Sequence, residues 1–488
     1  MKTSSDRDRR SGTALGRAAS GRIQPRISLL VFVLLGGCGG SIAAYEPEDL
    51  ARTAEHPSFS DSLPALPPNA PPPPRPVERK PTVTLEEAVF EALAQAPEVL
   101  AGTEAIIQAR ADLKTASTYP NPTFTAGTTL QPAGTHFTAS NSGGPPQYSF
   151  DLNIPLDPLV FGKQSAGMES ARRAVDVAGA DQADLKRARA GDVASSFYDV
   201  LQAKALLLLV REDLENLKRV EALTRRRVDL GGAPAVDLDR ARLAVANSQQ
   251  DVRTAESLEL SSRATLRALL GRTGSEPGFD VAGSLEIPHP LVPPDLESVL
   301  KTAEQFRADL VSLRRQVERW LAEARSQGRQ GLPQLSVTGG YIYQVQDSLG
   351  LKNQNEWEAM VGISLPLFDR NQGNIAKAES QARQANYTLE AKRAAVRAEL
   401  AQDLSGFQAA QAAAVADDRT QLDAAKSVRD RMEAAYQAGG RTVLELLDAE
   451  RAYRDAQRLH IGVQSAYWHS LYRINAAAGT TVLKDGGR

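Results

Sequence analysis

The segment GDVASSFYDVLQAKALLLLVREDLENL, residues 191–217, lies within a run from Gly162 to Gly231 that contains no proline. Apolar or small residues recur in it every seven positions, in two parallel series. The series are Val193, Val200, Leu207, Leu214 and Ser196, Ala203, Val210, Leu217. Such a repeat marks a helix face that packs along a partner helix. At about 1.5 Å per residue, one helix over the whole run would be roughly 100 Å long. The sequence therefore predicts a rod, far longer than a globular helix.

A glycine turn at Gly231 and Gly232 ends this rod, because glycine readily adopts the left-handed backbone that closes a helix. After Pro234 the seven-residue spacing returns. Its positions are Leu238, Val245, Val252 and, beside them, Ala241, Ser248, Ala255. We therefore expect the chain to turn back and form an antiparallel hairpin of long helices, in which alanines allow close approach.

The same order of landmarks occurs a second time, 208 to 213 positions later. The matched landmarks are Pro120 with Pro333, Ile154-Pro155-Leu156 with Leu365-Pro366-Leu367, Gly162 with Gly373, Gly231-Gly232 with Gly439-Gly440, and Gly271 with Gly479. The run from Gly373 to Gly439 also lacks proline, so we expect a second rod that turns at Gly439 and Gly440. We predict two structural repeats, residues 82–272 and 295–480, with a Pro/Gly-rich linker at 273–294 and a C-terminal tail at 481–488.

Each repeat also contains a strand pair between its first helix and its rod. Tyr148, Phe150, Leu152 and Ile154 alternate with polar residues, which is the period of a strand with one apolar face. Its expected partner is 123–130, and the second repeat offers 335–345 and 361–365. The fold class is therefore mainly helical with a small β part. The strands fit a lipid-facing surface over a polar lumen, although two hairpins capping a soluble coiled coil would show the same pattern.

Four strands are too few to close a barrel, since about eight is the minimum and open edges are not tolerated in lipid. A membrane-spanning interpretation therefore requires several copies to share one barrel.

The N-terminus predicts export and a lipid anchor. Residues 1–37 form a signal peptide, in which an arginine-rich start precedes the nine-residue apolar run ISLLVFVLL, too short to cross a membrane. Cys38, the only cysteine, follows Leu35-Gly36-Gly37 and resembles the acylated cysteine of a bacterial lipoprotein. A chance cysteine in an ordinary signal peptide is the alternative. Residues 38–81 are rich in proline and predict an extended tether between the lipidated end and the folded body.

Composition excludes several classes of function. The 488 residues carry 57 Lys+Arg against 59 Asp+Glu and only 5% aromatics, so a nucleic-acid-binding surface is not expected. One cysteine and five scattered histidines give no local metal-ligand spacing. No nucleophile elbow, phosphate-binding loop or catalytic triad motif is present. We therefore expect no enzyme activity, no metal site and no cofactor beyond the lipid on Cys38.

The order of elements over about 82–480 resembles the TolC-like outer membrane efflux factor family. The stretches that carry the resemblance are TLEEA at 84–88, Asn121-Pro122, PLFDRNQG at 366–373, and AYQAG at 435–439 leading into ELLDA at 445–449. PLFDRNQG looks most like the heavy-metal efflux branch, the CzcC type. The resemblance implies a homotrimer in which twelve strands share one barrel in the outer membrane of a Gram-negative bacterium and the helices form a periplasmic α-barrel. It implies a passive exit duct for cations, heavy metals or drugs, which a periplasmic adaptor and an inner-membrane pump would supply.

The same resemblance implies a periplasmic gate at the hairpin turns. The residues that match it are Asp237, Tyr436, Arg441, Glu445 and Asp448. Glu445 and Asp448 lie on one helix face, and three copies would bring six carboxylates together and raise their pKa values. Asp237, Tyr436 and Arg441 would tie neighbouring hairpins in the closed state. Exposed turn charges, and simple packing for Tyr436, are the alternatives.

Two other functions remain open at this point. The chain could be the outer membrane component of type I protein secretion, which the sequence separates poorly from efflux. It could also be a periplasmic adaptor or a structural coiled-coil lipoprotein without a pore, although an adaptor should show one hairpin flanked by split β-domains.

Overall fold

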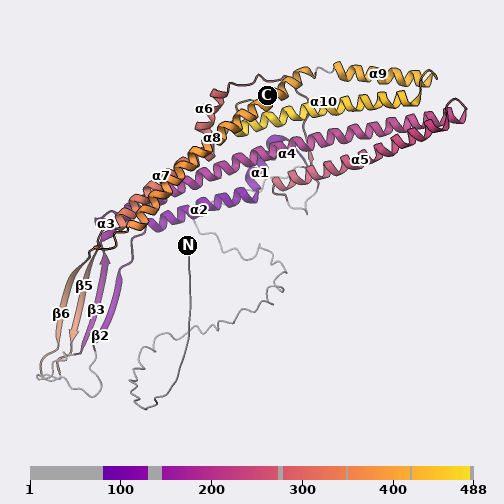
Figure 1. Ribbon diagram of the computed structural model, residues 1–488. Coiled ribbons are helices and arrows are strands. Elements are labelled where there is room, and N and C mark those ends of the chain that lie inside the picture. Colours follow the sequence, from indigo (N-terminus) through magenta and orange to yellow (C-terminus); the bar gives the residue numbers. More distant parts are fainter. Residues whose placement is uncertain (1–80, 130–145, 273–277, 348–349, 418–419, 484–488) are drawn as a thin grey trace, which may run out of the picture. The chain divides into compact units, whose positions relative to one another are not determined.

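The computed structural model describes residues 81–129, 146–272, 278–347, 350–417 and 420–483 (Figure 1). The predicted signal peptide, Cys38 and nearly all of the tether lie outside the described residues. The elements in chain order are β1 Thr82–Val83, α1 Leu85–Gln95, α2 Pro97–Ser117, β2 Thr123–Thr129, β3 Gln147–Pro155, α3 Asp157–Val160, α4 Lys163–Asp229, α5 Ala235–Leu269, β4 Asp280–Val281, α6 Leu296–Phe306, α7 Ala308–Gln330, β5 Gln334–Gln344, β6 Gln354–Ser364, α8 Gln372–Ala416, α9 Thr420–Gln437 and α10 Val443–Ala478.

Four strands form one antiparallel sheet in the order β2-β3-β5-β6. β3 and β5, one from each predicted repeat, pair in the middle, with Phe150 opposite Tyr341 and Ile154 opposite Val337. The register places most apolar side chains on one face and mainly polar ones on the other. The apolar face is solvent-exposed in the single chain, to 44% at Phe150 and 84% at Trp357. The predicted mainly helical fold with a four-stranded sheet is confirmed.

The first rod is continuous, as predicted. α4 runs for 67 residues and packs against α2, α5, α7 and α10. Val193 and Val200 of the seven-residue series are fully buried, because each faces a neighbouring helix. α4 also contains a window that is long and apolar enough to cross a membrane, but 56% of that window is buried inside the protein. Packing against other helices accounts for this apolar character, as it does in the core helix of a soluble protein.

The second rod differs from the prediction. α8 ends at Ala416, Asp417 leaves the helical conformation with φ −82° and ψ 60°, and α9 begins at Thr420. The expectation of one unbroken helix from Gly373 to Gly439 is therefore wrong. His460 of α10 lies at this break, with its Nδ1 2.6 Å from Asp417 Oδ2. The histidine is four-fifths buried, and its partner is the residue at which α8 leaves the helical conformation.

A smaller correction concerns how the repeats align. The left-handed residue before α4 is Gly162, with φ +66°, and the corresponding residue before α8 is Asn371, with φ +62°. Gly373, which the sequence matched to Gly162, lies inside α8. The structural match is thus two residues earlier than the sequence match.

Each repeat begins with two helices that meet at a break, at Ala96 between α1 and α2 and at Arg307 between α6 and α7. The glycine that ends each returning helix packs on the corresponding break. A Cβ on Gly271 would lie 2.9 Å from the carbonyl oxygen of Gln95, and one on Gly479 would lie 2.9 Å from Arg307 Cα. Both glycines also have left-handed backbone, with φ +71° and +77°. The two repeats therefore share one joint that only glycine fits.

The described part of the segment between the repeats, 278–294, packs into the core. β4 pairs in parallel with β1, and Phe279 and Val281 are almost fully buried. Trp468 Nε1 donates to Leu285 O at 2.9 Å, which fixes this segment on α10. Stacking of Trp468 on Tyr198 of α4, with ring centroids 5.2 Å apart, continues the same core. The segment is therefore a structural connection between the repeats and not only a linker.

Candidate functional site

The two hairpin turns are built in the same way. The first glycine of each pair, Gly231 and Gly439, has left-handed backbone with φ +71° and +83°. The second glycines, Gly232 and Gly440, donate their N–H groups back to Arg227 O and Ala435 O at 2.7 and 2.9 Å. A Cβ on either second glycine would make only ordinary contacts, at 3.5 and 3.6 Å. The backbone thus requires glycine at the first position of each turn and tolerates a side chain at the second.

Arg441, Thr442 and Glu445 form one connected group at the start of α10. Thr442 is the N-cap, and its Oγ1 accepts from Glu445 N while Glu445 Oε2 accepts from Thr442 N at 2.9 Å, a capping box. Arg441 Nη1 pairs with Glu445 Oε1 at 2.8 Å. These hydrogen bonds, that of the Thr442 backbone above all, lower the pKa of Glu445. In a single chain the glutamate is therefore firmly ionised, and only carboxylates from other copies could supply the raised pKa expected of a clustered gate.

The other two predicted gate carboxylates pair within their own helices. Asp237 is 8% exposed and its carboxylate lies 3.3 Å from Arg240 on the next turn of α5. Asp448 is largely exposed and lies 3.5 Å from Arg451 on α10. Among the described residues, neither carboxylate forms an ion pair with a side chain of the opposite hairpin. Any role for them between hairpins requires a neighbouring copy.

Tyr436 joins the two hairpins inside one chain. Its ring is 1% exposed and its hydroxyl donates to Thr224 Oγ1 of α4 at 2.8 Å. The Arg227 guanidinium lies 4.4 Å from the ring centroid and donates to Tyr436 O at 2.8 Å. Val220 of α4 and Val443 and Leu446 of α10 complete this small buried cluster. In the single chain Tyr436 therefore has a packing role. Its role in tying neighbouring hairpins in a closed state stays a prediction.

The sequence patterns did not single out Thr224 or Arg227, although Thr224 carries a signal. Thr224 continues the series Ser196, Ala203, Val210, Leu217 by one more step of seven, which places it on the packed face. Its hydroxyl donates to Val220 O at 2.8 Å, so the polar group is satisfied within the helix and still accepts from Tyr436. Arg227 has no such signature, because long basic side chains near a helix end are usually solvated.

Two buried carboxyl groups lie further along the same hairpins. Asp213 of α4 accepts from Ser248 at 3.1 Å and lies 3.5 Å from Arg454 of α10, yet burial raises its pKa. Glu450 of α10 is 5% exposed, and burial raises its pKa to about 7, against the opposing effect of Arg429. These groups were also missed, since nothing in the spacing of α10 marks position 450 as buried. The hairpins therefore enclose a carboxyl that titrates near neutral pH.

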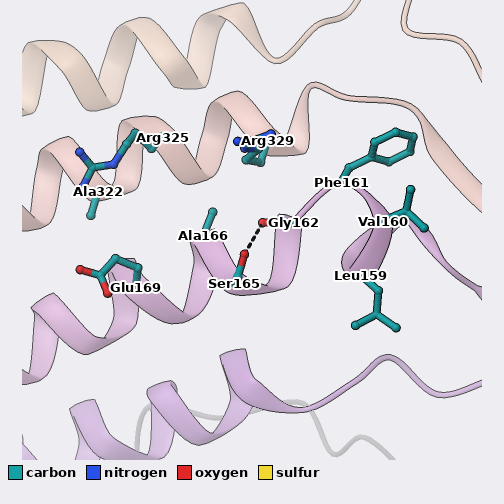
Figure 2. Close-up of a pocket in the computed structure, with 10 residues that line it drawn as sticks. All are labelled: Leu159, Val160, Phe161, Gly162, Ser165, Ala166, Glu169, Ala322, Arg325 and Arg329. Atoms are coloured by element: carbon teal, nitrogen blue, oxygen red, sulfur yellow. Dashed lines mark hydrogen bonds between the residues drawn. The ribbon is translucent and has the colours of Figure 1, made fainter.

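At the other end of α4, a groove lies between the first turns of α4 and the last turns of α7. Figure 2 shows Arg325 and Arg329 on α7, across from Glu169 on α4, with Phe161 at the turn that leads out of the sheet. The groove is open to solvent and has a volume of about 500 Å³. Among the described residues, no group of three or more His, Cys, Asp or Glu side chains is placed to hold a metal ion.

Similarity to known proteins agrees with this architecture. A relative from Cupriavidus metallidurans, the cobalt-zinc-cadmium resistance protein CzcC, is 28% identical over 336 residues, which are 67% of this chain and 76% of that protein. The cation efflux system protein CusC of Escherichia coli strain K12 is 24% identical over 310 residues, 63% of this chain and 67% of that protein. A crystal structure of CusC superposes with a TM-score of 0.67 at 22% identity, covering 81% of this chain and 92% of that one.

The sequence profile described as outer membrane efflux protein matches residues 88–272 and 299–480, well over half of the chain. The two matched blocks each contain one strand pair and one long hairpin of the fold described above. The chain therefore belongs to the outer membrane efflux protein family.

Proposed function

We propose that three copies of this chain form the exit channel of a tripartite efflux system. Membership of the family makes the chain a non-enzymatic outer membrane efflux channel with a periplasmic extension. The observation that carries the trimer is the four-stranded sheet, which has an exposed apolar face and two edge strands, β2 and β6. Open edges are not stable in lipid, so the sheet needs partners at both ends. Three copies would supply twelve strands, enough to close one barrel.

The helical hairpins would extend the conduit into the periplasm. The hairpin turns lie at the end of α4 opposite to β3, separated from it by a helix of 67 residues, or about 100 Å. We assign contact with a periplasmic adaptor, and through it with an inner-membrane pump, to this end. Names of relatives such as the cobalt-zinc-cadmium resistance protein favour divalent or other metal cations as cargo. An exit duct need not bind what passes through it, so the cargo would be selected by the pump.

The gate is assigned to Asp237, Tyr436, Arg441, Glu445 and Asp448 at the two turns. Arg441 compensates Glu445 at 2.8 Å, and both side chains are partly exposed, so a neighbouring copy could reach either one. Six carboxylates from three copies, at Glu445 and Asp448, would create a field that attracts cations. The lipid anchor is assigned to Cys38, and a mass increase of the mature protein that disappears in Cys38→Ser would test it.

Single-channel recording of the purified protein in planar bilayers tests the function. We expect a trimer with ion current, and we expect Arg441→Glu to raise the conductance because it places a second carboxylate beside Glu445. Arg226→Glu is the matched control, since Arg226 is exposed near the other hairpin turn and has no ion pair among the described residues. A stable monomer without current would favour the adaptor hypothesis. Equal currents in the wild type and both variants would refute the assignment of Arg441 to the gate, but they would still support the channel function.

A further inference from the structure

The groove between α4 and α7 lies where the sheet passes into the helices. β3 ends at Pro155 and α4 begins at Lys163, while α7 ends at Gln330 and β5 begins at Gln334. β3 and β5 are the inner strands of the sheet, and α4 and α7 pack side by side. Neighbouring copies would add to the edges β2 and β6. The groove therefore remains within one copy when the barrel closes.

Exposed apolar side chains surround the groove where the sheet passes into the helices. Leu159 and Val160 of α3 are 65% and 60% exposed and line the groove. The corresponding turn after β6 carries Leu367 and Phe368, which are 65% and 92% exposed. These side chains would be covered by lipid if the apolar surface of the sheet extends as far as α3 and the turn after β6. Contact with lipid would then explain their exposure in the single chain. Lys163, by contrast, is buried and neutralised by Asp157 at 2.8 Å, which ties α3 to α4.

Two arginines add positive charge to the same groove. Arg325 and Arg329 are exposed and lie one helical turn apart on α7 (Figure 2). Neither side chain has a hydrogen bond or ion pair with another described residue in the structure. The one carboxylate that lines the groove, Glu169, is engaged on its own helix by Arg173 at 2.8 Å and Arg172 at 3.7 Å. The groove thus holds two uncompensated guanidinium groups beside exposed apolar surface.

We propose that this groove binds the headgroup of an anionic phospholipid in the periplasmic leaflet of the outer membrane. The guanidinium groups would donate to the phosphate, a geometry that arginine satisfies better than lysine. Leu159 and Val160 would contact the acyl chains, and basic residues at a membrane surface attract anionic lipids. The inference rests on the proposed function, because it requires the apolar face of the sheet to lie in the membrane.

Native mass spectrometry of the channel released from detergent tests this site with two lipids, phosphatidylglycerol and phosphatidylcholine of the same acyl chains. We expect wild-type trimers to retain phosphatidylglycerol preferentially. The double variant Arg325→Gln/Arg329→Gln should lower that preference about twenty-fivefold, since each basic residue near an anionic surface contributes roughly fivefold. Arg226→Gln/Arg431→Gln is the matched control, because it removes two exposed arginines near the hairpin turns, remote from the sheet. It should keep the wild-type preference.

Conductance and oligomeric state are measured on the same samples. Conducting wild-type trimers without a preference for phosphatidylglycerol would overturn the lipid site and leave the channel intact. An equal loss in the control pair would show a general effect of charge and overturn it as well. Displacement of the lipid by millimolar inorganic phosphate, with the same dependence on Arg325 and Arg329, would identify a site for free anions in the lumen. A monomer without current would refute the proposed function and this site together.

Discussion

Glu450 should make the packing of the second hairpin sensitive to pH near neutrality. Its carboxyl is 5% exposed, and burial raises its pKa from an ordinary 4.5 to about 7. Arg429 of α9 and Arg219 of α4 oppose the rise, whereas the charges of Asp213 and Glu433 add to it. Between pH 4.5 and 7 the packed hairpin binds more protons than an opened one. Its stability therefore falls as pH rises through this window and stays low above pH 7.

The size of the effect follows from the pKa. A rise from 4.5 to about 7 corresponds to about 3 kcal/mol of packing free energy, at about 1.4 kcal/mol per pH unit. Glu450→Gln removes the ionisable group but keeps its shape. We expect the variant and the wild type to be nearly equally stable at pH 4.5. At pH 8 the variant should be more stable by up to about 3 kcal/mol, which corresponds to an opening constant roughly two-hundredfold smaller.

Hydrogen exchange of α9 and α10 peptides between pH 5 and 8, corrected for intrinsic exchange rates, measures this difference directly. Glu212→Gln is a suitable control, because Glu212 precedes Asp213 on α4 but its side chain is exposed. The control should follow the wild type at every pH. Parallel profiles for the wild type and Glu450→Gln across the whole range would refute the reasoning, since they would show that the pKa of the carboxyl is the same in the packed and opened hairpin.

Two further substitutions test contacts that hold the helices together. Tyr436→Phe removes the 2.8 Å hydrogen bond to Thr224 but keeps the ring, so we expect a loss of about 1 kcal/mol in thermal or exchange stability of the hairpins; an unchanged value would mean that water replaces the bond. Arg272→Ala leaves Glu91 without its bidentate partner, at 2.6 and 2.7 Å, in a site where both side chains are at most 4% exposed. We expect a loss of about 3–5 kcal/mol, and Glu91→Gln/Arg272→Met should lose less, a ranking that thermal unfolding would confirm or reverse.

The long helix α4 was predictable because its pattern is redundant. The seven-residue series continues through Val193, Val200 and their neighbours without a single proline, so one misplaced residue would not change the prediction. The sheet was predictable for a similar reason, since alternation in Tyr148 to Ile154 fixes which face is apolar. Such signals are local, and each is repeated many times along the chain.

The break at Asp417 was not predictable in this way. The surrounding sequence contains neither proline nor glycine, and alanines dominate it, so helix propensity favours continuation. The contact that accompanies the break is made with His460, which is 43 residues away in the sequence. Pairwise contacts at such separation depend on how α8 and α10 pack, which periodicity and local helix propensity do not show.

The candidate gate shows the same division. Spacing put Glu445 and Asp448 on one helix face. It did not predict the ion pair that Arg441 forms with Glu445. Spacing could not show that Tyr436 faces Thr224 on the other hairpin, since the two are 212 residues apart. Nor could it show that Glu450 is buried, because the charge of a glutamate normally predicts exposure.

Only a few groups hold the second hairpin in its packed position, and the contribution of one of them changes with pH. Tyr436 is the only described residue of α9 that is fully buried, whereas the neighbouring α4 buries residues along most of its length. α9 is also separated from α8 by the break at Asp417. Its position therefore depends on the Tyr436 cluster, which favours packing at every pH, and on the ionisation of Glu450, which opposes packing above neutral pH. Because segments with few buried contacts open first, the second hairpin, which also carries Arg441 and Glu445, is the part of the proposed gate whose movement costs least.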